Sequence, residues 1–172
     1  MTHQTVDLGA GHRIRSATRE DMTRVGQIAR QAWKRIHDSF ANIMGREMHA
    51  ALYPNWEEQK EAQVRGHWER NPEWLLVVEE AQDGKVAAFI TFRIERERSL
   101  GTISNNAVAP ESQGRGGGTK MYTHVLSLFR QEGLKYAMVG TGMDEGHAPA
   151  RRAYEKAGFD IPRTDVTYYK YL

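Results

Sequence analysis

Hydrophobic positions recur along this chain with two different periods, and each period predicts one kind of element. Between residues 22 and 36 they lie three or four places apart, the spacing of one face of an amphipathic helix. Between residues 86 and 95 every second position is hydrophobic, as in a half-buried strand. Thr18 precedes the first pattern and acidic residues follow it, so we expect a helix with Thr18 as its N-cap.

The segment between these two patterns predicts more helix. Residues 42–45 and Pro54-Asn55 interrupt the helical spacing. A second helix is then expected over residues 56–70, on positions four apart: Trp56, Lys60, Val64 and Trp68. A segment so rich in aromatic residues, histidine and charge either covers a binding cleft or forms a solvated helical cap.

Three strands are expected next, as an antiparallel meander. They cover residues 74–80, 86–95 and 102–108, and Asp83-Gly84 is a typical hairpin turn between the first two. Ala109-Pro110 ends the third strand, because proline removes a donor and holds the residue before it extended.

A glycine-rich loop follows the third strand and leads into a helix. Four of the five residues from Gly114 to Gly118 are glycine, and hydrophobic residues then recur at helical spacing up to Phe129. Such a loop directs unpaired N–H groups and the positive end of a helix dipole at one spot, which predicts an anion site, most simply for phosphates. A flexible surface turn is the alternative.

Two known phosphate motifs fit this loop poorly. A P-loop needs Gly-Lys-Ser/Thr, but here Lys120 follows Thr119 and is one place late. A Rossmann fingerprint needs a third small residue where Thr119 lies and an acidic residue about 20 positions on, where residues 135–139 contain none.

The remaining elements complete a mixed sheet. Residues 134–140 predict a strand parallel to 102–108, residues 149–156 a helix with Gly158 as its cap, and residues 166–171 a last strand. Residues 13–17 predict a short opening strand after an N-terminal tail of about residues 1–12. We expect one α/β (α+β) domain over residues 1–172, with a mostly antiparallel central sheet flanked by helices.

The composition argues against several classes of function but does not identify one. The 24 Lys and Arg against 22 Asp and Glu argue against nucleic acid, and the absence of cysteine excludes disulfides and a thiol nucleophile. The seven histidines show no metal-ligand spacing, so no metal is expected. No signal peptide or membrane span is evident, so a cytoplasmic protein with no membrane partner is the expectation.

The motif Gln113-Gly114-Arg115-Gly116-Gly117-Gly118 resembles the signature of the GCN5-related N-acetyltransferases (GNAT). A second resemblance lies in residues 147–159, which are similar to that family's later helix and aromatic turn. The order of elements from about Arg13 is also the family's, although the motifs are confined to residues 108–159. The resemblance implies the acyl-CoA N-acyltransferase fold, with a splayed pair of parallel strands and acetyl-CoA as cosubstrate.

The resemblance also implies roles for individual residues. Backbone amides of Gln113, Gly114, Arg115, Gly116, Gly117, Gly118 and Thr119 would hold the cofactor's pyrophosphate. The N–H near Val108 would polarise the thioester carbonyl, and Tyr154 would protonate the departing thiolate. His147 stands where the family often has asparagine, so it keeps a cofactor contact, acts as a base or caps the helix. The alternative for Tyr154 is a buried core tyrosine whose hydroxyl is bonded to a backbone carbonyl.

Two functions therefore remain open. The first is acetyl transfer to a primary amine, and the second is a non-catalytic acyl-CoA-binding or sensing module on the same fold. Nucleotide phosphate binding is a more remote third. The acceptor amine is not indicated, and Glu145, in the loop after the second parallel strand, is the first carboxylate to test as base. The tyrosine-rich last strand could pair across a homodimer.

Overall fold

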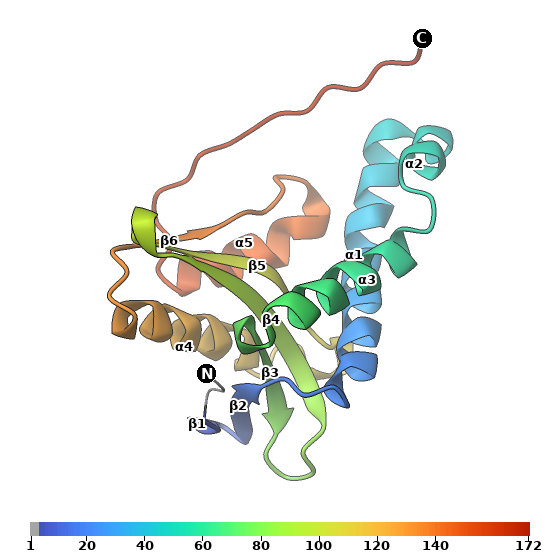
Figure 1. The fold of residues 1–172 in the computed structure, drawn as a ribbon. Helices are drawn as coiled ribbons and strands as arrows, with labels where there is room; N and C mark the ends of the chain where they lie inside the picture. Colours follow the sequence, from blue (N-terminus) through green and yellow to red (C-terminus); the bar gives the residue numbers. More distant parts are fainter. Residues whose placement is uncertain (1–3) are drawn as a thin grey trace.

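The computed structural model describes residues 4–172 and contains one mixed six-stranded sheet (Figure 1). The strands lie in chain order: β1 (Val6–Gly9), β2 (His12–Ser16), β3 (Leu75–Glu80), β4 (Val86–Glu95), β5 (Leu100–Val108) and β6 (Tyr136–Val139). Neighbours from β1 to β5 are antiparallel, and β5 and β6 are parallel. The expected fold class is confirmed.

Helices cover both faces of this sheet, as Figure 1 shows. On one face lie α1 (Asp21–Met44) and α3 (Trp56–Arg70), while α2 (Arg46–Leu52) lies beyond the sheet at the end of α1. On the other lie α4 (Gly117–Gln131) and α5 (Ala148–Lys156). Short 3₁₀ turns η1 (Pro72–Trp74), η2 (Arg96–Arg98), η3 (Pro110–Ser112) and η4 (Glu145–His147) join the elements.

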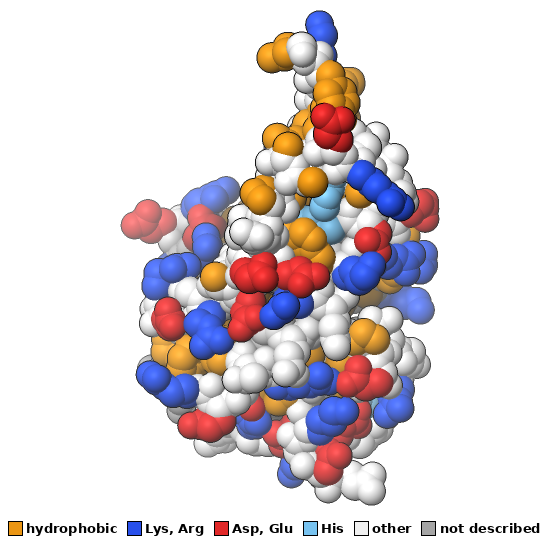
Figure 2. Space-filling model, turned by 90° about the vertical axis from the view of Figure 1, so that its right-hand side faces the viewer, with side chains coloured by type: hydrophobic (Ala, Val, Ile, Leu, Met, Phe, Trp, Pro, Cys, Tyr) orange, Lys and Arg blue, Asp and Glu red, His pale blue; other side chains and the backbone are white. Residues whose placement is uncertain are grey.

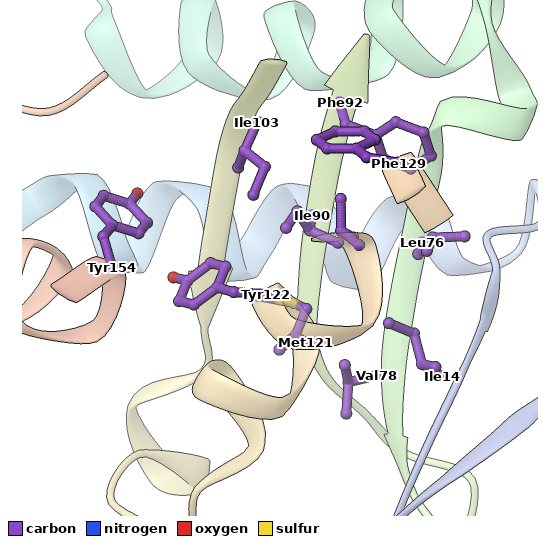
Figure 3. Close-up of a cluster of buried hydrophobic side chains, with 12 residues drawn as sticks. Ile14, Leu76, Val78, Ile90, Phe92, Ile103, Met121, Tyr122, Phe129 and Tyr154 are labelled. Carbon is purple, nitrogen blue, oxygen red and sulfur yellow. The ribbon is translucent and has the colours of Figure 1, made fainter. Parts of the chain in front are cut away.

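The central strands feed two separate cores because their side chains alternate between the faces. Leu76 and Val78 of β3 pack with Ile90 and Phe92 of β4 beneath α4, as Figure 3 shows. Leu75 and Val77 face the other way and pack with Val25 and Ile28 of α1. With both faces covered, β3 is a continuous apolar run.

A bulge in β5 prepares the functional site. Ile90 is opposite Asn106 and Phe92 is opposite Ile103, so Ser104 and Asn105 share the single partner Thr91. The Thr91 hydroxyl closes the bulge, accepting from the Asn105 N–H at 2.8 Å and donating to its carbonyl at 3.1 Å. The pairing of β5 with β6 runs from Leu100–Tyr136 to Ile103–Val139, and the two strands separate from there on.

Several boundaries differ from the sequence predictions. The segment expected as a tail contains β1, which forms a hairpin with β2; residues 1–3 of that tail lie outside the described part. Thr18 is not the side-chain cap of α1, which begins after Glu20. The N–H and the hydroxyl of Thr18 both donate to the Asp21 carboxylate, at 2.8 and 3.2 Å. The helix expected over residues 56–70 is confirmed as α3.

The last expected strand is wrong for this structure. Residues 166–171 are extended but pair with no strand among residues 4–172, and Figure 1 shows them running from the sheet past α2. The segment lies along α2 instead, where the Tyr169 hydroxyl is 3.1 Å from that of Tyr53 and the Tyr171 hydroxyl lies near Gly45. The alternating pattern correctly predicted an extended backbone, but a strand also needs a neighbouring strand with a free edge to pair with.

Candidate functional site

The gap between β5 and β6 begins at the bulge and opens toward the ends of both strands. Ala109 donates its N–H to the Ala87 carbonyl at 2.8 Å, so Val108 and Ala88 face each other as a non-hydrogen-bonded pair. The N–H of Val108 therefore points away from β4 and into the gap. The backbone thus offers a donor at the position where sequence similarity predicted one.

The glycine loop lies beyond the end of β5 and leads directly into α4. Gly114 and Gly116 have φ angles of +79° and +81°, which favour glycine, and Gly116 is the residue before the helix. The first intrahelical bond runs from the Lys120 N–H to the Gly116 carbonyl, so the N–H groups of the first turn have no intrahelical acceptor. These donors and the helix dipole form the anion-binding geometry predicted for residues 113–119.

Side chains fix this loop from below. Gln113 donates its amide to the Val108 carbonyl at 3.2 Å, which ties the loop to the strand end. Glu80 accepts from the Ser112 hydroxyl at 3.2 Å and lies 3.6 Å from the Arg115 guanidinium. Arg115, expected to add charge at the pyrophosphate, thus pairs with Glu80 on the outer side of the loop, beside a hollow of about 240 Å³.

Tyr154 of α5 reaches the same gap from the α4–α5 face. Its hydroxyl accepts from the Asn106 amide N–H at 2.9 Å and donates to the Asn106 side-chain oxygen at 3.2 Å. The Tyr122 hydroxyl donates to the same oxygen at 2.7 Å. Figure 3 shows both tyrosine rings beside β5. Burial raises the pKa of Tyr154, and hydrogen bonding to Asn106 and Tyr122 offsets part of that effect. The phenol therefore carries its proton at neutral pH.

The opposite face of the strand carries a different group. The bulge directs Asn105 toward α3, where the ammonium of Lys60 donates to its side-chain oxygen at 3.1 Å. The ammonium also lies 4.2 Å from the ring centre of Trp33 in α1. Burial lowers the pKa of Lys60 to about 8, because the charged form loses its hydration.

An aromatic wall lines this face, formed by Phe40, Tyr53, His37, His49 and Trp56 of α1–α3. His37 stacks on Trp56 with ring centres 4.1 Å apart, and its Nδ1 lies 3.0 Å from Nε2 of His49. Burial, aided by the charges of His49 and Lys60, lowers the pKa of His37 to about 4, so its ring is neutral at pH 7. Figure 2 shows histidine beside hydrophobic side chains on this face.

The loop after β6 contains the two remaining predicted residues. Glu145 is exposed, and its carbonyl accepts from Arg35 of α1 at 3.3 Å. His147 precedes α5 but makes no capping bond; its Nδ1 lies 2.6 Å from the Asp144 carboxylate. Of the three alternatives for His147, the side-chain cap is not formed, because Asp144 holds the ring.

Two asparagines are the residues that sequence reasoning undervalued. No sequence motif singles out Asn105 and Asn106, yet their side chains bond Lys60 and Tyr154 on opposite faces of β5. Their adjacency on a strand was the signal, since neighbouring side chains there point to opposite sides. The bulge that sets which side each one takes is not visible in the sequence.

The candidate site does not coincide with the larger hollow in the structure. A larger hollow of about 640 Å³ lies at the far end of β4, lined by Trp74, Phe92 and Arg96 among others, and includes neither the glycine loop nor Tyr154. We place the site on backbone donors and side-chain geometry instead. Within residues 4–172, no three His, Asp or Glu side chains are grouped as a metal site, and no helix there is long and apolar enough to span a membrane.

A splayed parallel strand pair, with a glycine loop at a helix N-terminus beyond one strand, defines an acyl-CoA-binding class of fold. The acetyltransferase (GNAT) family model matches residues 37–159, and the chain belongs to that family. The resemblance in the motif is thereby confirmed.

Individual relatives agree with the family. The chain is 36% identical to a mycothiol acetyltransferase of Stackebrandtia nassauensis over 104 residues, which are 59% of this chain and 33% of that protein. A mycothiol acetyltransferase of Streptomyces coelicolor is 31% identical over 87 residues, which are 51% of this chain and 28% of that protein. The chain thus matches a third or less of the length of these relatives.

Solved structures show the same fold at low sequence identity. PaiA N-acetyltransferase of Thermoplasma acidophilum, in complex with coenzyme A, has a TM-score of 0.70 at 18% identity and covers 90% of this chain and 92% of its own. YncA of Salmonella typhimurium, with acetyl-CoA, has a TM-score of 0.61 at 20% identity and covers 89% and 82%.

Proposed function

We propose that the protein is an N-acetyltransferase that moves the acetyl group of acetyl-CoA to a primary amine by direct attack. One observation carries the proposal: the Val108 N–H, the glycine-loop donors and the Tyr154 hydroxyl converge on a single gap between β5 and β6. Family membership and the CoA ligands named for two structural relatives support it. A cytoplasmic location and a homodimer are further parts of the proposal.

Backbone groups would bind the cofactor. The amides of Gln113–Thr119 would hold the pyrophosphate, whose negative charge suits the N-terminus of α4. The thioester carbonyl would accept from the Val108 N–H, which would stabilise the negative charge that develops on that oxygen during attack. Arg115 would contribute only by leaving Glu80, since the two are paired.

Tyr154 would supply a proton to the leaving group. The amine nitrogen forms a bond to the acetyl carbon, the carbon–sulfur bond breaks, and the thiolate takes the phenol proton. The Asn106 side chain fixes the phenol, because it donates its amide N–H to the phenol oxygen and accepts the hydroxyl hydrogen at 3.2 Å; that hydrogen would turn from Asn106 to the thiolate. A phenol that stays protonated at neutral pH can serve as this acid.

A screen of primary amines with acetyl-CoA tests the proposal, read both as free thiol release and as acetylated product by mass spectrometry. The chain has no cysteine, so every thiol detected comes from coenzyme A. We expect thiol and acetylated amine in equal amounts. Tight acetyl-CoA binding without product from any amine would favour the alternative, a non-catalytic acyl-CoA-binding module.

A further inference from the structure

The imidazole of His147 is held rigidly where the two faces of the molecule meet. Asp144 contacts its Nδ1 at 2.6 Å and also accepts from the Gly146 N–H at 2.9 Å. Arg151 of α5 donates to the carbonyls of Gly142 and Asp144 at 2.7 and 2.8 Å, which fixes the loop itself. A catalytic group needs this kind of support, because small displacements reduce rates strongly.

Asp144 also determines which ring nitrogen can accept a proton. Burial alone would raise the pKa of Asp144, but hydrogen bonds from His147, Ser39 and the Gly146 N–H outweigh it and lower the pKa below its usual range. An ionised carboxylate can only accept, so Nδ1 of the neutral ring must carry the hydrogen. Nε2 is then the free acceptor, the arrangement by which a carboxylate prepares a histidine base.

The position of His147 relates it to Tyr154. His147 directly precedes α5, and Tyr154 lies seven residues later in the helix. At that spacing both side chains project from one side of the helix, about 10 Å apart along its axis. An acid at one point and a base at another can serve the same carbonyl, directly or through one water molecule.

His147 also borders the aromatic wall. Its ring centre is 6.0 Å from that of Phe40, and Phe40 in turn contacts Tyr53 and His37 of the wall. The loop packs tightly on α1, since a Cβ at Gly146 would lie 2.9 Å from the Ile36 Cα. An acceptor lying along this wall would bring its amine to His147.

We propose that His147, oriented by Asp144, takes the proton from the acceptor amine, and that the acceptor is an amine of the α-amino class bound against the aromatic wall. This inference rests on the proposed acetyl transfer. As the carbon–nitrogen bond forms, one N–H proton passes to Nε2 of His147 while the thiolate receives the Tyr154 proton. Exchange with solvent then restores both side chains.

The chemistry of the base limits the acceptor. An α-amino group with a pKa of 7.7–8.0 is deprotonated at a cost of about 1 kcal/mol at pH 7, whereas a lysine-like amine near 10.4 costs about 4–5 kcal/mol. An imidazole suits the first task. Three carboxylates on this side are already ion-paired: Asp38 with Lys34, Glu57 with Arg30, and Asp144 with His147.

The charged groups around His147 define the test. They are Asp144, the neighbouring Glu145, Arg151 of α5 and Arg35 of α1. Glu145 is the competing base, because it lies two residues from His147, carries a carboxylate and is exposed. Glu155→Gln is the matched control, because it removes an exposed carboxylate of α5 that no part of the proposed site uses. The variants are His147→Asn, which gives the family's usual residue, His147→Gln, should the first not fold, Asp144→Asn and Glu145→Gln.

Kinetics with an amino-acid amide and a simple alkylamine as probes should separate the roles. We expect wild type to prefer the amino-acid amide and His147→Asn to lower kcat at least about 100-fold, with acetyl-CoA affinity by calorimetry within twofold. In Asp144→Asn kcat should also fall, since Nδ1 of His147 loses the carboxylate that holds the ring. Glu155→Gln should change neither the rate nor the affinity.

Nitrogen-15 NMR of the imidazoles gives a readout without turnover. The His147 signals, assigned by their loss in His147→Asn, should show Nδ1 protonated and Nε2 free at pH 8. An Nε2–H tautomer would overturn the inference, as would full activity of a folded His147 variant, lost activity in Glu145→Gln, or a preference for the alkylamine. Matching losses in acetyl-CoA affinity and rate would make His147 a cofactor contact. If wild type acetylates no amine, the proposed function itself fails.

Discussion

The two faces of β5 present different kinds of polar group. On the α4–α5 face, the functional groups are backbone donors of one loop and one strand end, plus a tyrosine from a nearby helix. On the α1–α3 face, they are side chains brought together from distant positions, such as Lys60 with Asn105 and Arg35 with the loop after β6. Binding a fixed cofactor needs only the first kind, whereas the second kind can vary with the acceptor.

The bulge joins these faces. It sends two adjacent asparagines to opposite sides, so one stretch of β5 holds Tyr154 through Asn106 and Lys60 through Asn105. A change at one asparagine should therefore affect one face with little effect on the other. The predictions below test that separation.

The largest effect is expected from Tyr154→Phe. Removing the acid should lower kcat about 100-fold, the low end of the usual range for a positioned acid, because a thiol with a pKa of about 8.5 is already a good leaving group. Acetyl-CoA affinity should stay the same. Tyr122→Phe is the matched control, since it also removes a hydroxyl from Asn106 but none from the reaction, and it should cost less than about tenfold. A full-speed Tyr154→Phe enzyme would make Tyr154 a core residue only.

Gly116→Val should weaken acetyl-CoA binding about tenfold or more. A side chain at a φ of +81° costs about 1–2 kcal/mol, which the loop relieves by leaving the geometry that aims its N–H groups. Gly133→Val is the control, because it carries the same strain at +75° in the turn after α4. Calorimetry should show an affinity loss in the first variant alone. Equal affinities in two folded variants would place the pyrophosphate elsewhere.

Gly118→Val tests the same site through packing. Gly118 is helical, and a Cβ there would lie 3.2 Å from the Val108 side chain, so valine should push the start of α4 away from the strand end. We expect weaker acetyl-CoA binding here too, without backbone strain. An unchanged dissociation constant would mean that the spacing between Val108 and α4 is not critical.

The sequence predicted the α4–α5 face well for a physical reason. A loop that needs positive φ must contain glycine, and a helix that starts beside a strand must leave donors free, so local sequence determines the geometry. Gly114, Gly116 and Tyr154 were therefore identified as candidates without a structure, although their roles stay proposals. Arg115 was less predictable, because its partner Glu80 is 35 residues away.

The contacts on the α1–α3 face could not be predicted from local sequence. Helical spacing in α3 indicates only which residues share a side of the helix, so it could not predict that Lys60 would contact Trp33 and Asn105. His147 was identified as a candidate, but its pairing with Asp144 depends on a one-turn loop held by Arg151. The final strand failed similarly, because alternation carries no information about the edge it must join.

The smallest expected effect, at Lys60, is on stability. Burial lowers its pKa from 10.5 to about 8, so between these pH values the unfolded chain binds a proton that the folded protein does not. Stability should therefore rise with pH across that window, and the cost of the buried charge is fully present below pH 8. Each pKa unit is worth about 1.4 kcal/mol, but partial exposure screens the charge, so we expect on the order of 1 kcal/mol.

Lys60→Met should remove this cost. The variant should be more stable than wild type at pH 7 by that amount, and the difference should shrink toward pH 10 as the wild-type ammonium titrates. Lys34→Met is the control, because Lys34 is an exposed lysine on the same face and should show a flat difference. Denaturant unfolding from pH 7 to pH 10 measures both. If Lys60→Met is less stable than wild type at pH 7, the contacts with Asn105 and Trp33 outweigh desolvation, and the lysine supports the fold of the α1–α3 face. The expected result would instead mean that the buried charge of Lys60 lowers the stability of the protein, as is typical of a residue retained for function.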